Sequence, residues 1–304
     1  MGLMNNGRVN IVITNQALRY SYHKNPSVVS MITHGEVELP EGTIVDGMVQ
    51  NKTVFEEVVH KLVKENKWKR KKLYFSVPDD TVVIRQIQIP VSLTNAEAIG
   101  YIRTQIGSSI YLPFSNPSLA VDFIDASETT RNVLLYAYPK EKISAYEEVF
   151  EKSGLRPIVA DLTALSVFRF YYQHKHEEND HVLLIHWNRD GLILTAFQHD
   201  KAVFTRHMKI NGREPQGNIA EESAEQTINE YMIEVNRIID FYQYSITKGQ
   251  SSIELILLSG DYPSLPSVRK NLTENISIPV FQFPLEKLSI KYLDVLGLAL
   301  KNEG

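Results

Sequence analysis

The sequence contains no cysteine, few glycines and no long apolar run, and each shortage excludes a class of protein. Without cysteine the chain has no disulfide, no thiolate nucleophile and no cysteine-ligated zinc or iron–sulfur site. No run of about 18 uncharged apolar residues occurs, so we expect no membrane-spanning helix. Residues 1–10 lack the apolar stretch of a secretory signal, and we therefore expect a cytoplasmic protein. The 15 glycines are few for a protein whose loops bind phosphate.

The overall charge is slightly acidic. The chain has 32 Lys and Arg residues against 36 Asp and Glu residues, which gives a formal net charge of -4. This balance argues against nucleic acid as the main partner, because binding to its backbone needs a basic surface. Hydrophobic residues make up 43% of the 304 residues, as in a soluble chain with a sizeable core. The length indicates about two domains.

One arrangement of predicted elements occurs twice: three strands, a helix and a further strand. Short apolar runs between turn residues predict the strands, and apolar residues at helical spacing predict the helices. In the first copy these elements cover 9–14, 17–22, 28–33, 53–66 and 73–77. In the second copy they cover 181–186, 192–198, 202–210, 220–246 and 253–258. We interpret this self-similarity as a duplicated domain.

Additional predicted elements separate the two copies. They are strands at 81–89, 118–124 and 132–138, helices at 95–108 and 141–152, a strand at 157–161 and a helix at 162–174. The pattern predicts an α/β protein with the duplicated actin-like (ribonuclease-H-like) ATPase fold and an inserted α+β subdomain. The predicted boundaries are 1–78 plus 155–178 for the first actin-like subdomain, 79–154 for the inserted subdomain and 179–304 for the second actin-like domain.

Five segments resemble a single family in their residues as well as in their order. They are SVPDDTVVIRQIQIP at 76–90, YIRTQIGSSIYLPF at 101–114, SGLRPIVADLTALSVFR at 153–169, YMIEVNRIIDFY at 231–242 and LLSGDYPSLP at 257–266. They are similar to motifs of the PilM family, cytoplasmic actin-like proteins of type IV pilus assembly that are related in fold to the cell-division protein FtsA. The resemblance implies a nucleotide site between the two domains, formed by the first hairpin of each copy and the loop after 253–258.

The first hairpin departs from the family pattern D-x-G-S-x-x-x-K that the resemblance implies. The positions of the acid, the glycine and the lysine fall on Val12, Thr14 and Arg19. An apolar side chain cannot hold magnesium, and a β-branched residue narrows the space that a phosphate needs.

The other two loops depart from the family pattern as well. The second pattern, D-I-G, falls on His186, Trp187 and Asn188, and the third loop has Asp261 where a second glycine belongs. A carboxylate at that place would repel phosphate.

From these three loops we predict a pseudo-ATPase with no catalytic residues and no cofactor. The alternative is an active ATPase that gates pilus assembly, with ATP and magnesium bound at the loops. The candidate binding residues would then be Thr14, Asn15, Arg19, Asn188, Gly191, Ser259 and Gly260.

Three other groupings invite a functional interpretation. His174, His176, His181 and His186 lie close in sequence, but the segment is charged, and we favour a solvated linker over a metal site. For the acidic pair at 79–80 we favour a polar turn over a catalytic pair. For the basic segment KWKRKK at 67–72 we favour a solvated rim over contact with anionic lipid or nucleic acid.

The resemblance also implies a partner. PilM-like proteins act as cytoplasmic scaffolds, and a PilN-like protein with one membrane span docks its short cytoplasmic tail between the first actin-like subdomain and the inserted one. Candidate contact residues here are Val83, Arg85, Ile87, Ile89, Tyr111, Leu112 and Phe114, and the apolar ones could equally be core. We expect the protein at the inner face of the membrane through partners, including other pilus assembly proteins, without insertion of its own. The pilus could serve adhesion, motility or DNA uptake (competence), and an FtsA-like filament is a third possibility.

Overall fold

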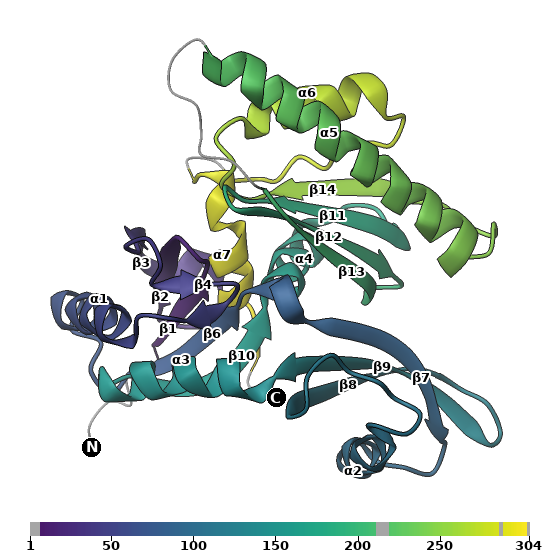
Figure 1. The fold of residues 1–304 in the computed structure, drawn as a ribbon, viewed down its shortest axis with the longest axis horizontal. Helices are drawn as coiled ribbons and strands as arrows, with labels where there is room; N and C mark the ends of the chain where they lie inside the picture. The colour runs from purple at the N-terminus through teal and green to yellow at the C-terminus, as the bar shows by residue number, and fades with distance from the viewer. Residues whose placement is uncertain (1–6, 211–218, 286–287, 303–304) are drawn as a thin grey trace.

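The computed structural model describes residues 7–210, 219–285 and 288–302. A five-stranded sheet forms the first lobe, a four-stranded sheet forms the second, and a three-stranded sheet forms the inserted subdomain (Figure 1). No helix in the described ranges combines the length and the apolar character that a membrane crossing requires.

The sheet of the first lobe has the strand order β10-β6-β1-β2-β3. Its strands are β1 (Arg8–Ile13), β2 (Ala17–His23), β3 (Met31–Glu38), β6 (Lys72–Val77) and β10 (Arg156–Leu162). The first three strands form antiparallel hairpins, whereas β6 runs parallel to both β1 and β10. All of β1 is buried, as expected for a strand in a sheet that is covered on both faces.

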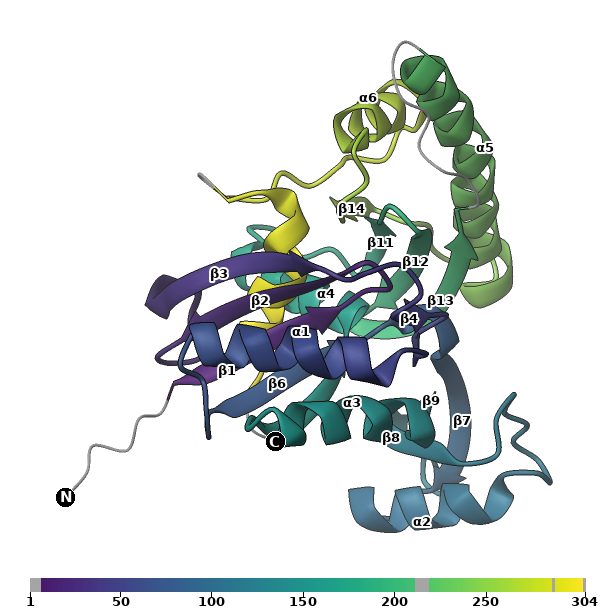
Figure 2. The same cartoon turned by 60° about the vertical axis from the view of Figure 1, so that its left-hand side comes forward.

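Two pairs of helices cover this sheet. On one face lie α1 (Lys52–Glu65) and α3 (Lys140–Lys152), and on the other lie α4 (Thr163–His174) and α7 (Leu293–Ala299) (Figure 2). Successive residues of β1 face opposite layers, so that Ile11 packs with Phe55 and Phe150, and Val12 packs with Val295. The first lobe therefore has helices on both sides, and α7 reaches it from the end of the sequence.

The second lobe repeats this plan with the strand order β13-β12-β11-β14. Its elements are β11 (His181–Trp187), β12 (Gly191–Gln198), β13 (Lys201–Lys209), α5 (Ile219–Phe241), β14 (Leu255–Ser259) and α6 (Leu265–Asn275). A π-helical turn at Tyr242–Ile246 follows α5. As in the first lobe, three antiparallel strands precede a helix and a strand parallel to the first, which confirms the predicted duplication.

The inserted subdomain is a sheet of strand order β7-β9-β8 that packs on one helix. It consists of β7 (Val83–Pro90), α2 (Asn95–Gln105), β8 (Pro117–Ala126) and β9 (Thr130–Pro139). A capping box between Thr94 and Glu97 starts α2. The predicted helix at 141–152 falls inside the insert by our sequence boundaries, yet α3 packs with α1 on the first lobe through Tyr146, Val149 and Phe150.

The remaining elements are short. They are β4 (Ile44–Val45), β5 (Met48–Val49) and 3-10 turns at Val28–Ser30, Asp79–Thr81 and Ile290–Tyr292. The strand predicted at 28–33 begins only at Met31, after a 3-10 turn. Close to the end of the described chain, α7 crosses α4 at Gly297, where a Cβ would lie 1.7 Å from the carbonyl oxygen of Ser166. Only glycine allows this crossing.

Candidate functional site

The three predicted nucleotide loops meet where the two lobes face each other. Asn15, after β1, donates a hydrogen bond from Nδ2 to Oδ2 of Asp190 at 2.8 Å. Asn188, after β11, accepts one from the backbone N–H of Asp261 at 3.2 Å through Oδ1. Thr14 stays within its own turn, since Oγ1 accepts from the backbone N–H of Ala17 at 2.9 Å. The loops therefore converge as predicted, but the side chains bond to one another.

Arg19 is the centre of the interface between the lobes. Its side chain is fully buried on β2 and forms ion pairs with Asp261 at 2.7 Å, with Glu36 at 2.9 Å and with Asp294. Burial alone would lower the pKa of Arg19, but the charges of Asp294, Asp261 and Glu36 outweigh burial and raise it. We call these four residues, together with Arg189, the Arg19 network.

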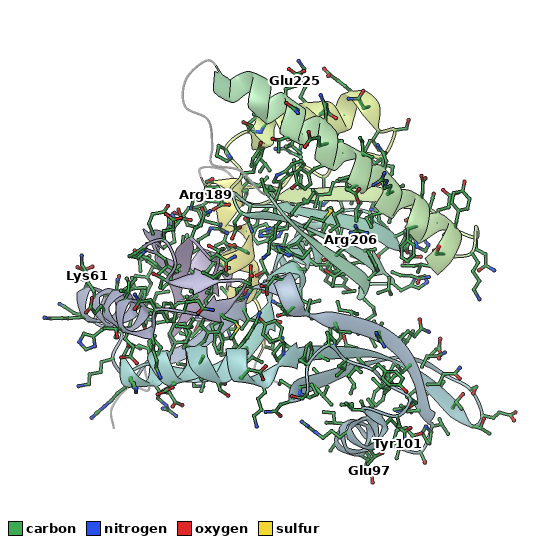
Figure 3. The ribbon with its side chains drawn as sticks, in the orientation of Figure 1. Lys61, Glu97, Tyr101, Arg189, Arg206 and Glu225 are labelled. Atoms are coloured by element: carbon green, nitrogen blue, oxygen red, sulfur yellow. The ribbon has the colours of Figure 1, made fainter. Side chains whose placement is uncertain are left out.

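The Arg19 network joins the lobes and continues to the surface. Arg189 contacts Asp261 through its backbone N–H at 3.0 Å and through Nε at 3.3 Å. Its Nη2 also lies 3.1 Å from Glu38 of the first lobe, and Arg189 is labelled in Figure 3. Burial tends to raise the pKa of Asp261, but Arg19 and Arg189 hold it below its usual value. The carboxylate at the glycine position is thus ionised and neutralised by arginines.

The space left at this interface is small. A cavity of about 30 Å³ remains. It is lined by Ile13, Thr14, Asn15, Pro78, Asp79, Asp80, Thr163, His186, Asn188, Asp190, Ile193 and His207. Pockets for small molecules usually measure about 300–1,000 Å³, whereas 30 Å³ admits only one or two water molecules. In this conformation side chains fill the place where the fold would hold a nucleotide.

His186 stands where the second family pattern has its carboxylate. The residue lines the cavity; its Nδ1 lies 2.7 Å from Oγ of Ser259, and its buried Nε2 has no hydrogen-bond partner among the described residues. Burial lowers the pKa of His186 to about 3, and the charge of Arg19 acts in the same direction. A neutral imidazole cannot neutralise a magnesium ion as a carboxylate does. The position of that carboxylate is therefore occupied by a neutral side chain.

The two glycines of the predicted site serve backbone packing. Gly260 has φ +119°, and a Cβ there would lie 2.0 Å from the carbonyl oxygen of Trp187. Trp187 is buried and stacks on Tyr262, with ring centroids 5.3 Å apart. Gly191 is less confined, because the nearest atom to a Cβ would be Nε2 of the His207 side chain, at 2.7 Å. Gly260 is therefore required by the backbone around it, whereas a side chain at Gly191 would require His207 to move.

Asp79 has a role that the sequence did not reveal. Its carboxylate accepts hydrogen bonds from the backbone N–H groups of Thr163 at 2.8 Å and Ala164 at 2.7 Å. These are the first residues of α4, so Asp79 caps that helix from another element. Burial raises the pKa of Asp79 to about 7. The acidic pair does form a turn, at Asp79–Thr81, as we favoured.

A much larger depression lies between the first lobe and the inserted subdomain. It has a volume of about 660 Å³, and three walls enclose it. One wall is β8 with β9, the second is β10 with α4, and the third is the turn from β12 to β13. Its lining includes Ser118, Ala120, Asp122, Tyr136, Leu162, Leu165, Phe168, Arg169, Tyr172, Phe197 and Lys201. We call this depression the insert groove.

The predicted partner residues lie away from the insert groove. None of Val83, Arg85, Ile87, Ile89, Tyr111, Leu112 and Phe114 lines it. Ile87, Ile89 and Leu112 pack in the core of the insert beneath α2. Arg85 is exposed on β7, and Tyr111 is 65% exposed after α2. The strand that lines the groove is β8, at the opposite edge of the sheet from β7, and the partner role of the seven residues stays a prediction.

The clustered histidines have separate contacts. Nδ1 of His174 lies 2.7 Å from the carbonyl oxygen of Phe170, and Nδ1 of His181 lies 2.7 Å from the hydroxyl of Tyr242. His176 is exposed in the linker before β11. Within the part of the chain that the structure describes, no three potential ligands are arranged to hold a metal ion.

Comparison with solved structures identifies the fold. The chain superposes on a PilM–PilN type IV pilus biogenesis complex with TM-score 0.75 and 18% identity, over 96% of this chain and 97% of that one. It matches a protein of Bacteroides thetaiotaomicron with an actin-like ATPase fold and unknown function at TM-score 0.54 and 11% identity, over 99% and 100%. It also matches MreB5 of Spiroplasma citri bound to AMPPNP at TM-score 0.51 and 10% identity, over 95% and 94%. The predicted actin-like fold is thereby confirmed.

Comparison with protein families gives the relationship by sequence. No curated protein matches the chain. The family model for type IV pilus assembly protein PilM matches residues 19–226, which is more than half of the chain. The chain therefore belongs to the PilM family of type IV pilus assembly proteins.

Proposed function

We propose that this protein is a cytoplasmic scaffold of a type IV pilus-like machine, which binds an extended cytoplasmic segment of a PilN-like membrane protein in the insert groove. Membership of the PilM family supports the process, and the related structure is a complex of PilM with PilN. The observation that carries the proposal is the insert groove, which has the size and shape for a peptide.

The wall formed by β8 suits an extended peptide. In the strand order β7-β9-β8, β8 pairs with β9 alone, so one edge of β8 has no neighbouring strand in the described chain. Such an edge offers backbone N–H and C=O groups to an added strand. Ala120 is exposed on this strand and lines the groove, and its small side chain leaves room for the backbone of a peptide.

The opposite wall supplies apolar contacts and few free charges. Leu165 and Tyr172 of α4 line the groove, and Tyr172 is 49% exposed. Arg169 is paired with Asp161 at 2.9 Å. A second ion pair, Lys201 with Asp122 at 3.5 Å, connects the second lobe to the insert. With its charges already paired, the groove would recognise backbone and apolar side chains in an extended segment.

The Arg19 network supports a pseudo-ATPase within this proposal. A triphosphate would have to displace the ion pair of Arg19 with Asp261 and then sit beside an ionised carboxylate. That exchange is unfavourable, because it breaks a buried pair and brings like charges together. The competing function is an ATP-binding member of the family that gates assembly by domain closure. It gains support from MreB5, which has the same fold and was solved with AMPPNP.

Peptide binding tests the scaffold function. The probe is a synthetic peptide that covers the cytoplasmic segment of the single-span membrane protein encoded beside this gene. Ala120→Arg fills the groove without removing a buried contact, and we expect it to weaken binding at least about tenfold, equal to 1.4 kcal/mol. Ala126→Arg is the matched control, since Ala126 is exposed on the same strand but outside the groove. Equal affinities of the two variants would refute this docking site.

A further inference from the structure

One edge of the first lobe concentrates positive charge although the chain as a whole is acidic. Six of the nine residues from 64 to 72 are Lys or Arg, and they cover the end of α1, the loop after it and the start of β6. Lys64, Lys67, Lys69 and Arg70 are exposed. Trp68 is 2% exposed and fixes the loop to the core of the lobe, so the loop is anchored and its cations lie in solvent.

The strand register extends this cationic edge. Arg8 of β1, Lys72 of β6 and Arg156 of β10 are in register across three neighbouring parallel strands. The starts of β1 and β6 lie with the α1–β6 loop on one side of the lobe, as Figure 2 shows. Arg8 is buried, whereas Arg156 is exposed. Residues 64–72 and Arg156 are called the basic edge below.

Counter-ions are scarce at the basic edge. Within the described residues, no carboxylate forms an ion pair with Lys64, Lys67, Lys69, Arg70 or Arg156. At the other end of α1 the situation differs, because Lys52 pairs with Glu148 at 2.5 Å. Glu65 lies within the segment and contributes one negative charge. The basic edge thus has a positive field available to an external anion.

The backbone of the loop shows how its charges can be removed. Lys67 has φ 58° and Arg70 has φ 64°, so two cationic residues adopt the left-handed conformation. Glycine or asparagine would adopt it at lower cost. Lys248 in the second lobe has the same conformation with φ 54°, so the conformation alone does not indicate a use for the charge. Glycine can replace Lys67 and Arg70 without backbone strain, which allows their charges to be tested.

We propose that the basic edge binds the anionic phospholipid headgroups of the membrane. Lipid fits better than nucleic acid, because Trp68 is buried and unable to stack on bases, and because the net charge of -4 disfavours a polyanion. The choice of lipid rests partly on the proposed function, which brings the chain to a membrane protein. The basic edge lies at the start of β10, and the insert groove lies at the end of the same strand. The seven residues of β10 span about 20 Å, which separates the two sites. A tail leaving the membrane would need about six extended residues to reach the groove.

Vesicle co-sedimentation of the full chain tests the proposal. The probes are vesicles of phosphatidylcholine with about 30% phosphatidylglycerol and vesicles of phosphatidylcholine alone, at low and at high salt. The double variant Lys67→Gly/Arg70→Gly removes two charges at positions whose φ favours glycine. Lys248→Gly is the matched control, because Lys248 is an exposed lysine with φ 54° in the second lobe.

We expect the protein to bind anionic vesicles and to be released by salt. Each cation near the surface contributes roughly fivefold, so the double variant should bind about 25-fold more weakly and the control unchanged. Equal binding to both vesicle types would overturn the proposal, as would an equal loss in the control. Stronger binding to a short DNA duplex than to anionic vesicles would assign the edge to nucleic acid instead. The tail peptide should bind the double variant normally, so a failure of peptide docking is distinguishable from a failure of lipid binding.

Discussion

Replacement of Arg19 by methionine tests whether the Arg19 network holds the lobes together. The side chains of Arg19 and Asp294 are both 0% exposed, and Asp261 is 8% exposed. In Arg19→Met, Asp261 would retain its ion pair with Arg189. Glu36 would retain its ion pair with Lys291, in which the charged atoms are 2.8 Å apart. Asp294 has no other ion-pair partner among the described residues and would be left as a buried, uncompensated charge.

The size of the effect follows from the buried charge of Asp294 that Arg19→Met leaves uncompensated. Removing one partner of a buried ion pair costs about 3–5 kcal/mol. Burial already raises the pKa of Asp294, and loss of Arg19 would raise it further. Since a carboxyl whose pKa rises on folding is stabilising only when protonated, Arg19→Met should be more damaging at pH 8 than at pH 5. The added substitution Asp294→Asn should recover about 0.5–3 kcal/mol as coupling energy.

Urea unfolding followed by fluorescence is a suitable assay, because the two tryptophans report on different lobes. Trp68 lies in the core of the first lobe and Trp187 in that of the second. Lys291→Met is the control, since Lys291 touches Glu36 from the rim at 30% exposure and should cost less than about 1 kcal/mol. Arg19→Met within about 1 kcal/mol of wild type, or as mild as the control, would refute the reasoning.

Two further predictions concern the interface between the lobes. Because burial raises the pKa of Asp79 to about 7 from 3.8, its contribution to stability should fall as pH rises between those values. In the variant Asp79→Asn, the unfolding free energy should depend less on pH in this range. An unchanged slope of unfolding free energy against pH would contradict the prediction. Addition of ATP and magnesium should leave the melting temperature unchanged. A bound ligand at about 100 times its Kd would raise the free energy of unfolding by roughly 2.7 kcal/mol and the melting temperature with it. A clear upward shift would favour the active ATPase.

Local patterns in the sequence predicted the two lobes because each lobe is built from consecutive elements. Strands such as β11 and helices such as α1 have periodic apolar residues, and their repeated order indicated the duplication. The meeting of the three loops followed from that repeat. The contacts of Arg19 did not, because its partner Asp294 is 275 residues away and no local signal connects them.

The insert groove could not be predicted from the sequence, because it depends on the strand order of the insert. The strands of the insert occur in the order β7, β8, β9, but β9 lies in the middle of the sheet and β8 at its edge. Sequence alone does not show which strand is the edge, and the candidates on β7 were chosen for their motif. The third wall, which includes Phe197 and Lys201, comes from the second lobe and had no local signal.

The position of α7 has a consequence for synthesis of the chain. The helix packs on β1 and β6 of the first lobe and carries Asp294, the most deeply enclosed partner of Arg19. A nascent first lobe would therefore expose the apolar face of β1 and a guanidinium paired only with Glu36 until residue 294 has left the ribosome. The amino-terminal half can therefore complete its folding only after the carboxy-terminal segment has been synthesised. A chain truncated before α7 should be a substrate for chaperones and proteases.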